Sequence, residues 1–386
     1  MLFSFCYLFF LEGEILAEAQ FVFSKGVTSY DIMTGAILIT LVLQLVQWIV
    51  SMLSRLPSRW HAFSYLPSML LLGCLSNLDR GGIIHFSLGN WVWIIPLVVL
   101  CYLLLVVVIR RLDNSREVYL LDIKSQIYPN FIILFLLILS LGFIPQATDV
   151  YHYELKAERL ILEKDYEGAA AVGKRSLTSS ARLTQLRMYA LSQQGLLADR
   201  LFDYPQYDGS LGLLDVTDTL SVYRFSPQRI CIHLGAYCDK SIHSTDRFYQ
   251  LVLADSLWNE HTVDYYLCSL LLDKKLKEFR KELPRYYALG DNDSGVYDRL
   301  PKAYKEALLL TGEHQHALEG KIVLHGDTLA VLTDYDLLAR FREYNHLKKE
   351  IGDERERVNR THREFGNTYW WYYDYSQLAN GELRKR

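Results

Sequence analysis

Four long runs without a single Asp, Glu, Lys or Arg constrain this 386-residue chain more than any other feature of its sequence. They cover residues 32–54, 60–78, 83–109 and 125–148, and each is rich in large apolar side chains. A helix needs roughly 20 apolar residues to cross the hydrocarbon core of a bilayer. Four such runs so close together would leave a soluble bundle without a polar face, so they predict membrane-spanning helices.

The charge distribution divides the chain where these runs end. Residues 1–148 hold 16 charged side chains, about 11% of that segment, whereas residues 149–386 hold the other 69, about 29%. We therefore expect a transmembrane domain over 1–148 and a water-exposed domain over 149–386. The expected spans are 32–54, 60–78, 88–109 and 127–147. The lipid bilayer is the predicted partner of the first domain, and the lack of excess positive charge argues against a nucleic-acid partner.

The apolar segment 1–11 (MLFSFCYLFFL) is short for a span. A cleaved signal would carry basic residues before its apolar stretch, but no Lys or Arg precedes Lys25 and Glu12 follows directly. We expect a fifth spanning helix here. The alternatives are an interfacial or re-entrant segment and a cleaved signal.

The basic residues of the short loops predict the orientation, because such loops stay on the cytoplasmic side. Alternate loops differ clearly: six Lys or Arg lie in the loops 55–59 and 110–124, against two, Lys25 and Arg80, in the others. This places everything after Gln146 outside the cytoplasm. In a bacterium the chain would be a multi-pass protein of the inner membrane with a periplasmic C-terminal domain.

From residue 149 the apolar periodicity is that of amphipathic helices, which makes the whole fold all-α. Paired helices are predicted over 152–163 with 166–177 and over 181–194 with 196–203, and a longer helix over 262–282. Pro and Gly residues interrupt the pattern between 204 and 245. The segment 319–332 fits either an extended pair or another helix.

The first of these hairpins resembles a tetratricopeptide repeat. Five of seven motif positions match by residue class, while Gly173 and Ala181 replace the expected Phe and Pro; the seven are Tyr153, Ala157, Leu160, Ala169, Gly173, Ser176 and Ala181. The resemblance implies an α-helical solenoid, a fold whose extended surfaces bind other proteins. The wider layout, with the segments LCSLLLDKKL, LPKAYKEALLL and GNTYWWYYDY, is similar to uncharacterised inner-membrane proteins of Bacteroides-type bacteria. That similarity implies no known activity.

Two clusters are candidate sites. Cys231, His233, Cys238 and His243 suit zinc by element, but their spacing matches no common zinc signature. A Cys231–Cys238 disulfide and ordinary buried thiols are the alternatives. The second cluster holds six aromatic residues within positions 369–375. They either pack within the domain or, through Trp370, Trp371, Tyr373 and Tyr375, contact a partner.

No catalytic or cofactor-binding motif was recognised, so the sequence favours a binding protein over an enzyme and predicts no cofactor. His314 and His316, and the segment DNDSG at 291–295, are expected to be turns. The leading hypothesis is a membrane-anchored scaffold that binds another protein through its helical domain. An envelope enzyme acting on a lipid-linked or saccharide substrate is the alternative, with Asp79, Arg80 and His85 as its short-loop candidates.

Transport is less favoured, because the four apolar runs hold no charged side chain. Their polar pair, Gln44 and Gln47, is expected to make hydrogen bonds between helices. The oligomeric state is not predicted.

Overall fold

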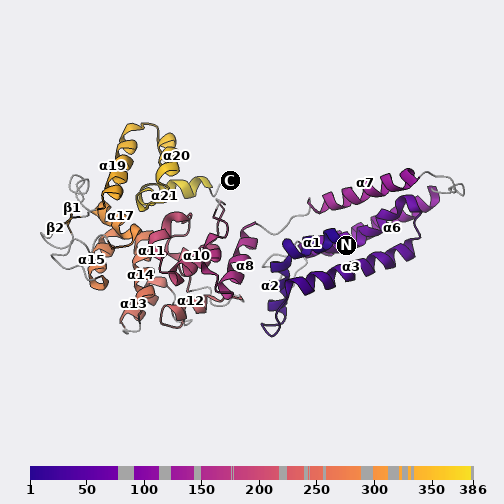
Figure 1. Ribbon diagram of the computed structural model, residues 1–386, viewed down its shortest axis with the longest axis horizontal. Coiled ribbons are helices and arrows are strands. Elements are labelled where there is room, and N and C mark those ends of the chain that lie inside the picture. The colour runs from indigo at the N-terminus through magenta and orange to yellow at the C-terminus, as the bar shows by residue number, and fades with distance from the viewer. Residues whose placement is uncertain are drawn as a thin grey trace. The chain divides into compact units, whose positions relative to one another are not determined.

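The computed structural model describes residues 1–76, 91–112, 123–142, 149–174, 176, 178–216, 224–238, 242, 244–254, 258–287, 299–311, 321–323, 329–331 and 334–383 (Figure 1). These residues are predominantly helical and form two compact units. The first contains Met1–Leu155 with Val222–Arg224, and the second contains Lys156–Ser221 with Phe225–Arg386. The all-α class is confirmed, with one small two-stranded pair added.

Helices make up the first unit. They are α1 (Leu2–Phe10), α2 (Gly13–Phe23), α3 (Ile32–Ser54), the 3-10 helix η1 (Ser58–Tyr65), α4 (Leu66–Ser76), α6 (Trp91–Leu112), α7 (Ile123–Leu141) and the start of α8 (Asp149–Leu162). The side chain of Asp31 caps the start of α3 by accepting from the backbone N–H of Thr34 at 2.8 Å. The helix ends where Arg55 takes a left-handed conformation, with φ of 42°.

The core of the first unit lies among α1, α2, α3, α4 and α7. Its buried members are apolar: Tyr7, Leu8, Leu16, Ala36, Leu43, Met69, Leu72 and Leu141. Gly35 lets a ring approach α3 closely, since a Cβ at this position would lie 2.1 Å from the ring of Tyr30. A second cluster joins α2 to α8 through Ile15, Ala19, Tyr151 and Leu155.

Arg224 also belongs to the first unit. Its guanidinium group donates to the carboxylates of Glu18 at 3.0 Å and Glu14 at 3.3 Å, and to the carbonyl oxygen of Leu155 at 3.3 Å. Glu18 is buried, so the ion pair satisfies a charge that would otherwise be costly to remove from water. This contact holds Arg224 against α2 and α8.

Among the described residues, two helices are long and apolar enough to cross a membrane: α3 over Ile32–Ser54 and α6 over Trp91–Arg111. The apolar part of α7, Gln126–Leu141, is shorter, and α1 has only nine residues. The prediction of four or five spanning helices is therefore not confirmed. The expected span 60–78 divides into η1 and α4 because Pro67 occupies the first turn of α4, where its missing N–H costs nothing.

The second unit is built from helices that follow one another as hairpins. After the end of α8 come α9 (Tyr166–Ala171), α10 (Ala181–Gln193), α11 (Leu197–Arg200), η3 (Leu201–Asp203), η4 (Gly209–Gly212), α12 (Pro227–His233), α13 (Thr245–Ala254), α14 (Glu260–Leu272), α15 (Leu276–Tyr286), α17 (Lys302–Thr311), α19 (Tyr335–Glu350), α20 (Glu354–Phe365) and α21 (Tyr369–Leu383). Strands β1 (Lys321–Val323) and β2 (Leu329–Val331) pair antiparallel, with Ile322 opposite Ala330. The segment 319–332 thus contains an extended pair.

Three of the hairpin turns share one geometry. Lys164, Gly195 and Lys274 each take a left-handed conformation directly after the last turn of α8, α10 and α14. In each turn, the next residue donates its N–H to a carbonyl five positions back: Asp165 to Leu160, Leu196 to Leu191, and Lys275 to Leu270, at 2.8–2.9 Å. This is the Schellman arrangement that ends helices. It also explains why the predicted helix 262–282 is two helices, α14 and α15.

Buried charges are paired inside the second unit. Arg182 donates to Glu158 at 2.8 Å, and both side chains are almost fully buried. Arg187 donates to the carbonyl oxygen of Val172 at 2.7 Å. These contacts tie α10 to α8 and to the end of α9, where an unpaired charge would be strongly destabilising.

Candidate functional site

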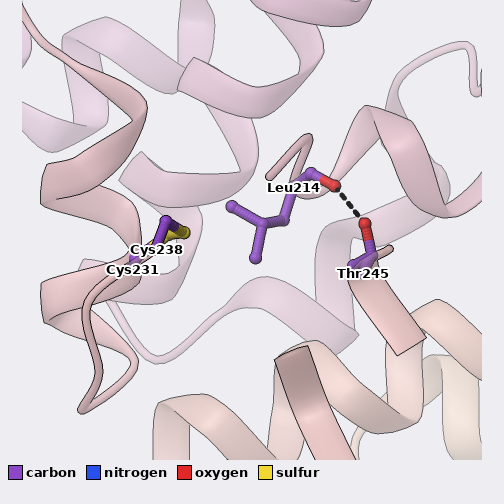
Figure 2. Close-up of a disulfide and its surroundings, with 4 residues drawn as sticks. All are labelled: Leu214, Cys231, Cys238 and Thr245. Atoms are coloured by element: carbon purple, nitrogen blue, oxygen red, sulfur yellow. Dashed lines mark hydrogen bonds between the residues drawn. A yellow bond between two sulfur atoms is a disulfide. The ribbon is translucent and has the colours of Figure 1, made fainter. Parts of the chain in front are cut away.

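Two cysteines of the predicted metal set form a disulfide. Cys231 lies in α12 and Cys238 in the loop after it, with their Cα atoms 5.8 Å apart. Figure 2 shows Leu214 pointing its side chain toward the disulfide while its carbonyl oxygen accepts from Thr245 at 3.0 Å. Both cysteines are buried, and as a disulfide neither sulfur is a thiolate that could hold zinc. Of the three alternatives for these cysteines, the structure contains the disulfide.

His233, the third member of that set, belongs to a different group. We call Ser192, Gln193, His233 and His261 the histidine cluster. His233 Nε2 lies 3.1 Å from Ser192 Oγ, and its Nδ1 lies 3.2 Å from Gln193 Nε2. Ser192 Oγ also lies 3.3 Å from Nδ1 of His261. The cluster therefore joins α10, α12 and α14 through one hydroxyl group.

The two imidazole rings of the cluster lie against each other, with centroids 4.3 Å apart and an angle of 33° between their planes. Burial and the neighbouring His261 lower the pKa of His233 to about 4, so its ring is neutral at pH 7. Asn259, the N-cap of α14, donates to the carbonyl oxygen of His233 at 2.8 Å. Thr262 donates to the carbonyl oxygen of Leu234 at 2.8 Å. The C-terminal end of α12 is thus held by backbone and side-chain contacts together.

The chemistry open to the histidine cluster is limited by access. Ser192 is buried, with 1% of its surface exposed, so a substrate cannot reach its hydroxyl group as it would reach a catalytic serine. Both histidines are half-buried. Among the described residues, no group of three His, Cys, Asp or Glu side chains is arranged to hold a metal ion. The cluster is suited to joining helices and to responding to protons.

Exposed apolar side chains lie next to this cluster along the chain. Ile232 precedes His233 and is 49% exposed, and Tyr237, inside the disulfide-closed loop, is 74% exposed. Trp258 precedes the cap residue Asn259 and is 42% exposed, with its ring 5.7 Å from that of Tyr286. We call Ile232, Tyr237 and Trp258 the apolar rim. Large apolar and aromatic side chains of this kind dominate the energetics of protein interfaces.

The aromatic residues near the C-terminus lie mostly inside the second unit. Trp370, Trp371 and Tyr375 are buried, and the Trp370 indole donates to the carbonyl oxygen of Glu306 at 2.8 Å. Tyr373 is half-buried, and its carbonyl oxygen accepts from Lys274 at 2.7 Å. The packing alternative therefore describes these rings. A partner surface that includes Trp370, Trp371, Tyr373 and Tyr375 stays a prediction.

In the first unit, the predicted glutamine pair makes the expected kind of contact. Gln44 donates to Gln47 at 2.8 Å, and Gln47 donates to Ser64 of η1 at 2.9 Å. A cavity of about 120 Å³ lies nearby between α1, α3, α4 and α7. Its lining side chains are all uncharged: Met1, Phe3, Ser4, Thr40, Leu43, Gln44, Tyr65, Ser68, Met69, Leu134 and Ile138. These contacts fit helix packing.

Sequence reasoning missed three members of the histidine cluster: Ser192, Gln193 and His261. His261 and Ser192 are 69 positions apart and sit on helices without any motif. The available signal was indirect: Ser192 lies in the last turn of α10, and His261 lies in the first turn of α14 between the capping residues Asn259 and Thr262. His243 lies outside the described residues, as do His314, His316, the segment 291–295 and the short-loop candidates Asp79, Arg80 and His85.

Comparison with known proteins finds one protein family. Its model, described as a family of unknown function (DUF6057), matches residues 83–239 and 237–376. The two ranges together cover well over half of the chain. They include the apolar helix α6 of the first unit and the helical hairpins of the second unit. No curated protein and no solved structure matches the chain.

Proposed function

The chain belongs to this family of unknown function, and we propose from its own structure that it is a membrane-anchored scaffold that binds another protein through its helical domain. The proposal has three parts: an anchor in the bilayer, a binding domain outside the cytoplasm, and a binding surface at the apolar rim. The apolar rim carries the proposal, because its three large apolar side chains are exposed to solvent and a protein partner could bury them.

The anchor is supported by the distribution of side chains in the first unit. Large apolar side chains face outward on the long helices, among them Leu38, Leu41, Leu45 and Trp48 on α3 and Leu97, Leu100, Leu103 and Leu104 on α6. Buried positions include hydroxyl and amide groups, such as Thr40, Gln47, Ser64 and Ser68. This is the reverse of a water-soluble bundle and suits helices surrounded by lipid. A bacterial inner membrane is the proposed location.

The orientation is supported by the ends of α3 and α6. Arg110, in the last turn of α6, donates to the carbonyl oxygens of Leu53 and Ser54 at the end of α3. The basic residues Arg55 and Arg111 therefore lie at one end of the first unit, as the positive-inside rule requires for a cytoplasmic end. The Cys231–Cys238 disulfide agrees with a helical domain in an oxidising compartment such as the periplasm.

The binding surface is supported by the rigidity of its surroundings. Ile232 lies on α12 and Tyr237 on the loop after it, and the disulfide joins the two. Trp258 precedes Asn259, which caps α14 through two reciprocal hydrogen bonds with Thr262. Side chains held in this way lose little freedom when a partner covers them, which favours affinity. Arg229 and Glu260 are exposed near the rim and offer both charges to a partner. A folded protein or peptide with a complementary apolar patch is the proposed occupant.

Photo-crosslinking in native membranes tests the proposal. A crosslinking amino acid at position 237 should capture a defined protein. The double variant Tyr237→Ala/Trp258→Ala should reduce the amount of that protein that co-purifies by about tenfold or more, since interface aromatic residues commonly contribute about 2 kcal/mol or more. Tyr335→Ala is the matched control, because Tyr335 is equally exposed but lies on α19. Capture that is absent, or that is equally strong from position 335, would refute the proposal.

The alternative, an envelope enzyme, lacks a supporting observation among the described residues. Its short-loop candidates lie outside them, Ser192 is buried beside its two histidines, and the exposed contact between Ser51 Oγ and His61 Nε2, at 3.2 Å, joins α3 to η1. Alanine substitution of Asp79, Arg80 and His85 together remains the direct test of that alternative.

A further inference from the structure

The hydrogen bonds of the histidine cluster run in one direction. The side-chain amide nitrogen of Gln193 can only donate, so Nδ1 of His233 must accept and the neutral ring carries its proton on Nε2. That proton is donated to Ser192 Oγ, which leaves the Ser192 hydroxyl free to donate to Nδ1 of His261. His261 then carries its proton on Nε2, 4.0 Å from the exposed carboxylate of Glu260.

A proton added to either ring breaks this order. Protonated His233 would turn Nδ1 into a donor facing the donor nitrogen of Gln193. Protonated His261 would point an N–H at Ser192 Oγ, which already accepts from His233, and would leave the hydroxyl hydrogen without that acceptor. With both rings charged and their centroids 4.3 Å apart, the two cations would also repel each other.

The groups around the cluster do not compensate for this loss. The ring of Tyr189 of α10 lies 5.2 Å from that of His233, and Arg229 of α12 lies over the ring of Phe225 and interacts electrostatically with Tyr189. From α14, Glu260 and Asp264 face His261, but Glu260 is solvated and Asp264 accepts hydrogen bonds from Tyr287 and Tyr304. The site therefore favours the neutral ring of His233.

We propose that the junction of α10, α12 and α14 is an acid-sensitive lock, in which a proton taken up by His233 releases α12 and its disulfide-closed loop from the other two helices. Release would be local, because the buried side chains of Ile230, Cys231 and Leu234 still anchor the segment. Since α12 and the loop carry Ile232 and Tyr237, the lock would also control the shape of the apolar rim. That last consequence rests on the proposed function, whereas the lock itself does not.

The burial that lowers the pKa of His233 predicts the direction of the effect. Its ordinary value of 6.5 falls to about 4 in the folded chain, so a released state gains protons between these values. After allowance for partial exposure of the ring, the population of the released state should rise about tenfold between pH 7.5 and pH 5.

Hydrogen exchange of the full-length protein in detergent micelles tests the lock without any partner. Corrected for intrinsic rates, the amides of 230–236 should lose about tenfold in protection at pH 5 relative to those of α15. The double variant His233→Gln/His261→Gln should lose this pH response, and Ser192→Ala should show low protection already at pH 7.5. His346→Gln is the control, because His346 is 80% exposed on α19.

The wild-type measurement decides the matter even where a variant fails to fold. Protection of 230–236 that is equal at both pH values would overturn the lock, as would a full acid response in a folded double variant. Neither result depends on the crosslinking experiment. A lock that fails while Tyr237 still captures a protein would leave the proposed function standing.

Discussion

The guanidinium group of Arg110 donates through Nε to the carbonyl oxygen of Ser54, with the two atoms 2.7 Å apart. Ser54 is the last residue of α3, whose final carbonyl groups have no partner within the helix, and Arg110 lies in the last turn of α6. A cation at the end of a helix is favoured by the helix dipole as well. This one contact fixes the C-terminal ends of α3 and α6 at the same end of the first unit.

The Arg110–Ser54 contact predicts the result of reporter fusions. Reporters joined after residues 57 and 118 should be active in the cytoplasm, and those joined after 82 and 150 should be active outside it, because both basic helix ends then lie inside. A periplasmic phosphatase and a cytoplasmic fluorescent protein, compared at each site, make the measurement. A cytoplasmic signal after residue 150 would contradict the proposed orientation.

The shared turn geometry predicts opposite effects for two substitutions. Gly195→Ala should lower the free energy of unfolding by about 1 kcal/mol, because the residue keeps a φ of 69° although the space around it is open. Lys164→Gly should raise it by a few tenths to about 1 kcal/mol, since exposed Lys164 holds a φ of 63°. Urea unfolding of the full-length protein in micelles measures both.

Lys274 provides the control for this pair of substitutions. It has the same backbone conformation as Lys164, but its Nζ donates to the carbonyl oxygen of Tyr373 and lies 5.7 Å from the rings of Tyr372 and Tyr373. Lys274→Gly should therefore gain less than Lys164→Gly. Equal gains at both positions would mean that these contacts contribute nothing.

The turns also mark the limit of what could be predicted from the sequence. Helix positions followed from apolar periodicity, and the Gly195 turn followed from the glycine itself. Lysine is no signal for a left-handed residue, so the break at Lys274 was not predicted and α14 and α15 were expected as one helix. The histidine cluster was missed for a different reason: Ser192, His233 and His261 meet only through packing of three helices, which local patterns do not encode.

The first unit shows a related limit. Uncharged runs predicted the positions of α3, α6 and α7 well, because apolar composition alone defines them. Composition did not predict that Pro67 would begin a helix and leave η1 as a separate turn. For the terminal aromatic residues, helical periodicity required several directions, but only the contacts of Trp370 with Glu306 and Phe341 reveal that the ring is buried.

The disulfide should contribute measurably to stability. Linking Cys231 to Cys238 closes a short loop and restricts the unfolded chain, for which the loop-entropy relation gives about 2 kcal/mol. We expect Cys231→Ala/Cys238→Ala to lower the free energy of unfolding by roughly this amount and to abolish any effect of a reductant on the urea midpoint. Cys268→Ala is the comparison, since this buried thiol is not in a disulfide and its variant should keep the response to reductant. An unchanged midpoint in the double alanine variant would show that the loop is held without the bond.

Glu306 predicts a dependence of stability on pH in the opposite direction from His233. Its carboxylate is buried between α17 and α21 and accepts from the backbone N–H of Tyr369 at 2.7 Å. Burial raises its pKa from 4.5 to about 7, with Lys302 partly opposing the shift. The folded chain therefore holds a proton that the unfolded chain releases, and the free energy of unfolding should fall as pH rises from about 4.5 through 7. The loss should be on the order of 2–3 kcal/mol.

Glu306→Gln keeps an acceptor for Tyr369 without a charge, so it should remove this slope and be more stable than the wild type at pH 8. Urea unfolding at pH 5, 6.5 and 8 compares the two, with Glu343→Gln on the exposed face of α19 as the control. Parallel curves for the wild type and Glu306→Gln would mean that the buried carboxylate stays ionised in the folded chain.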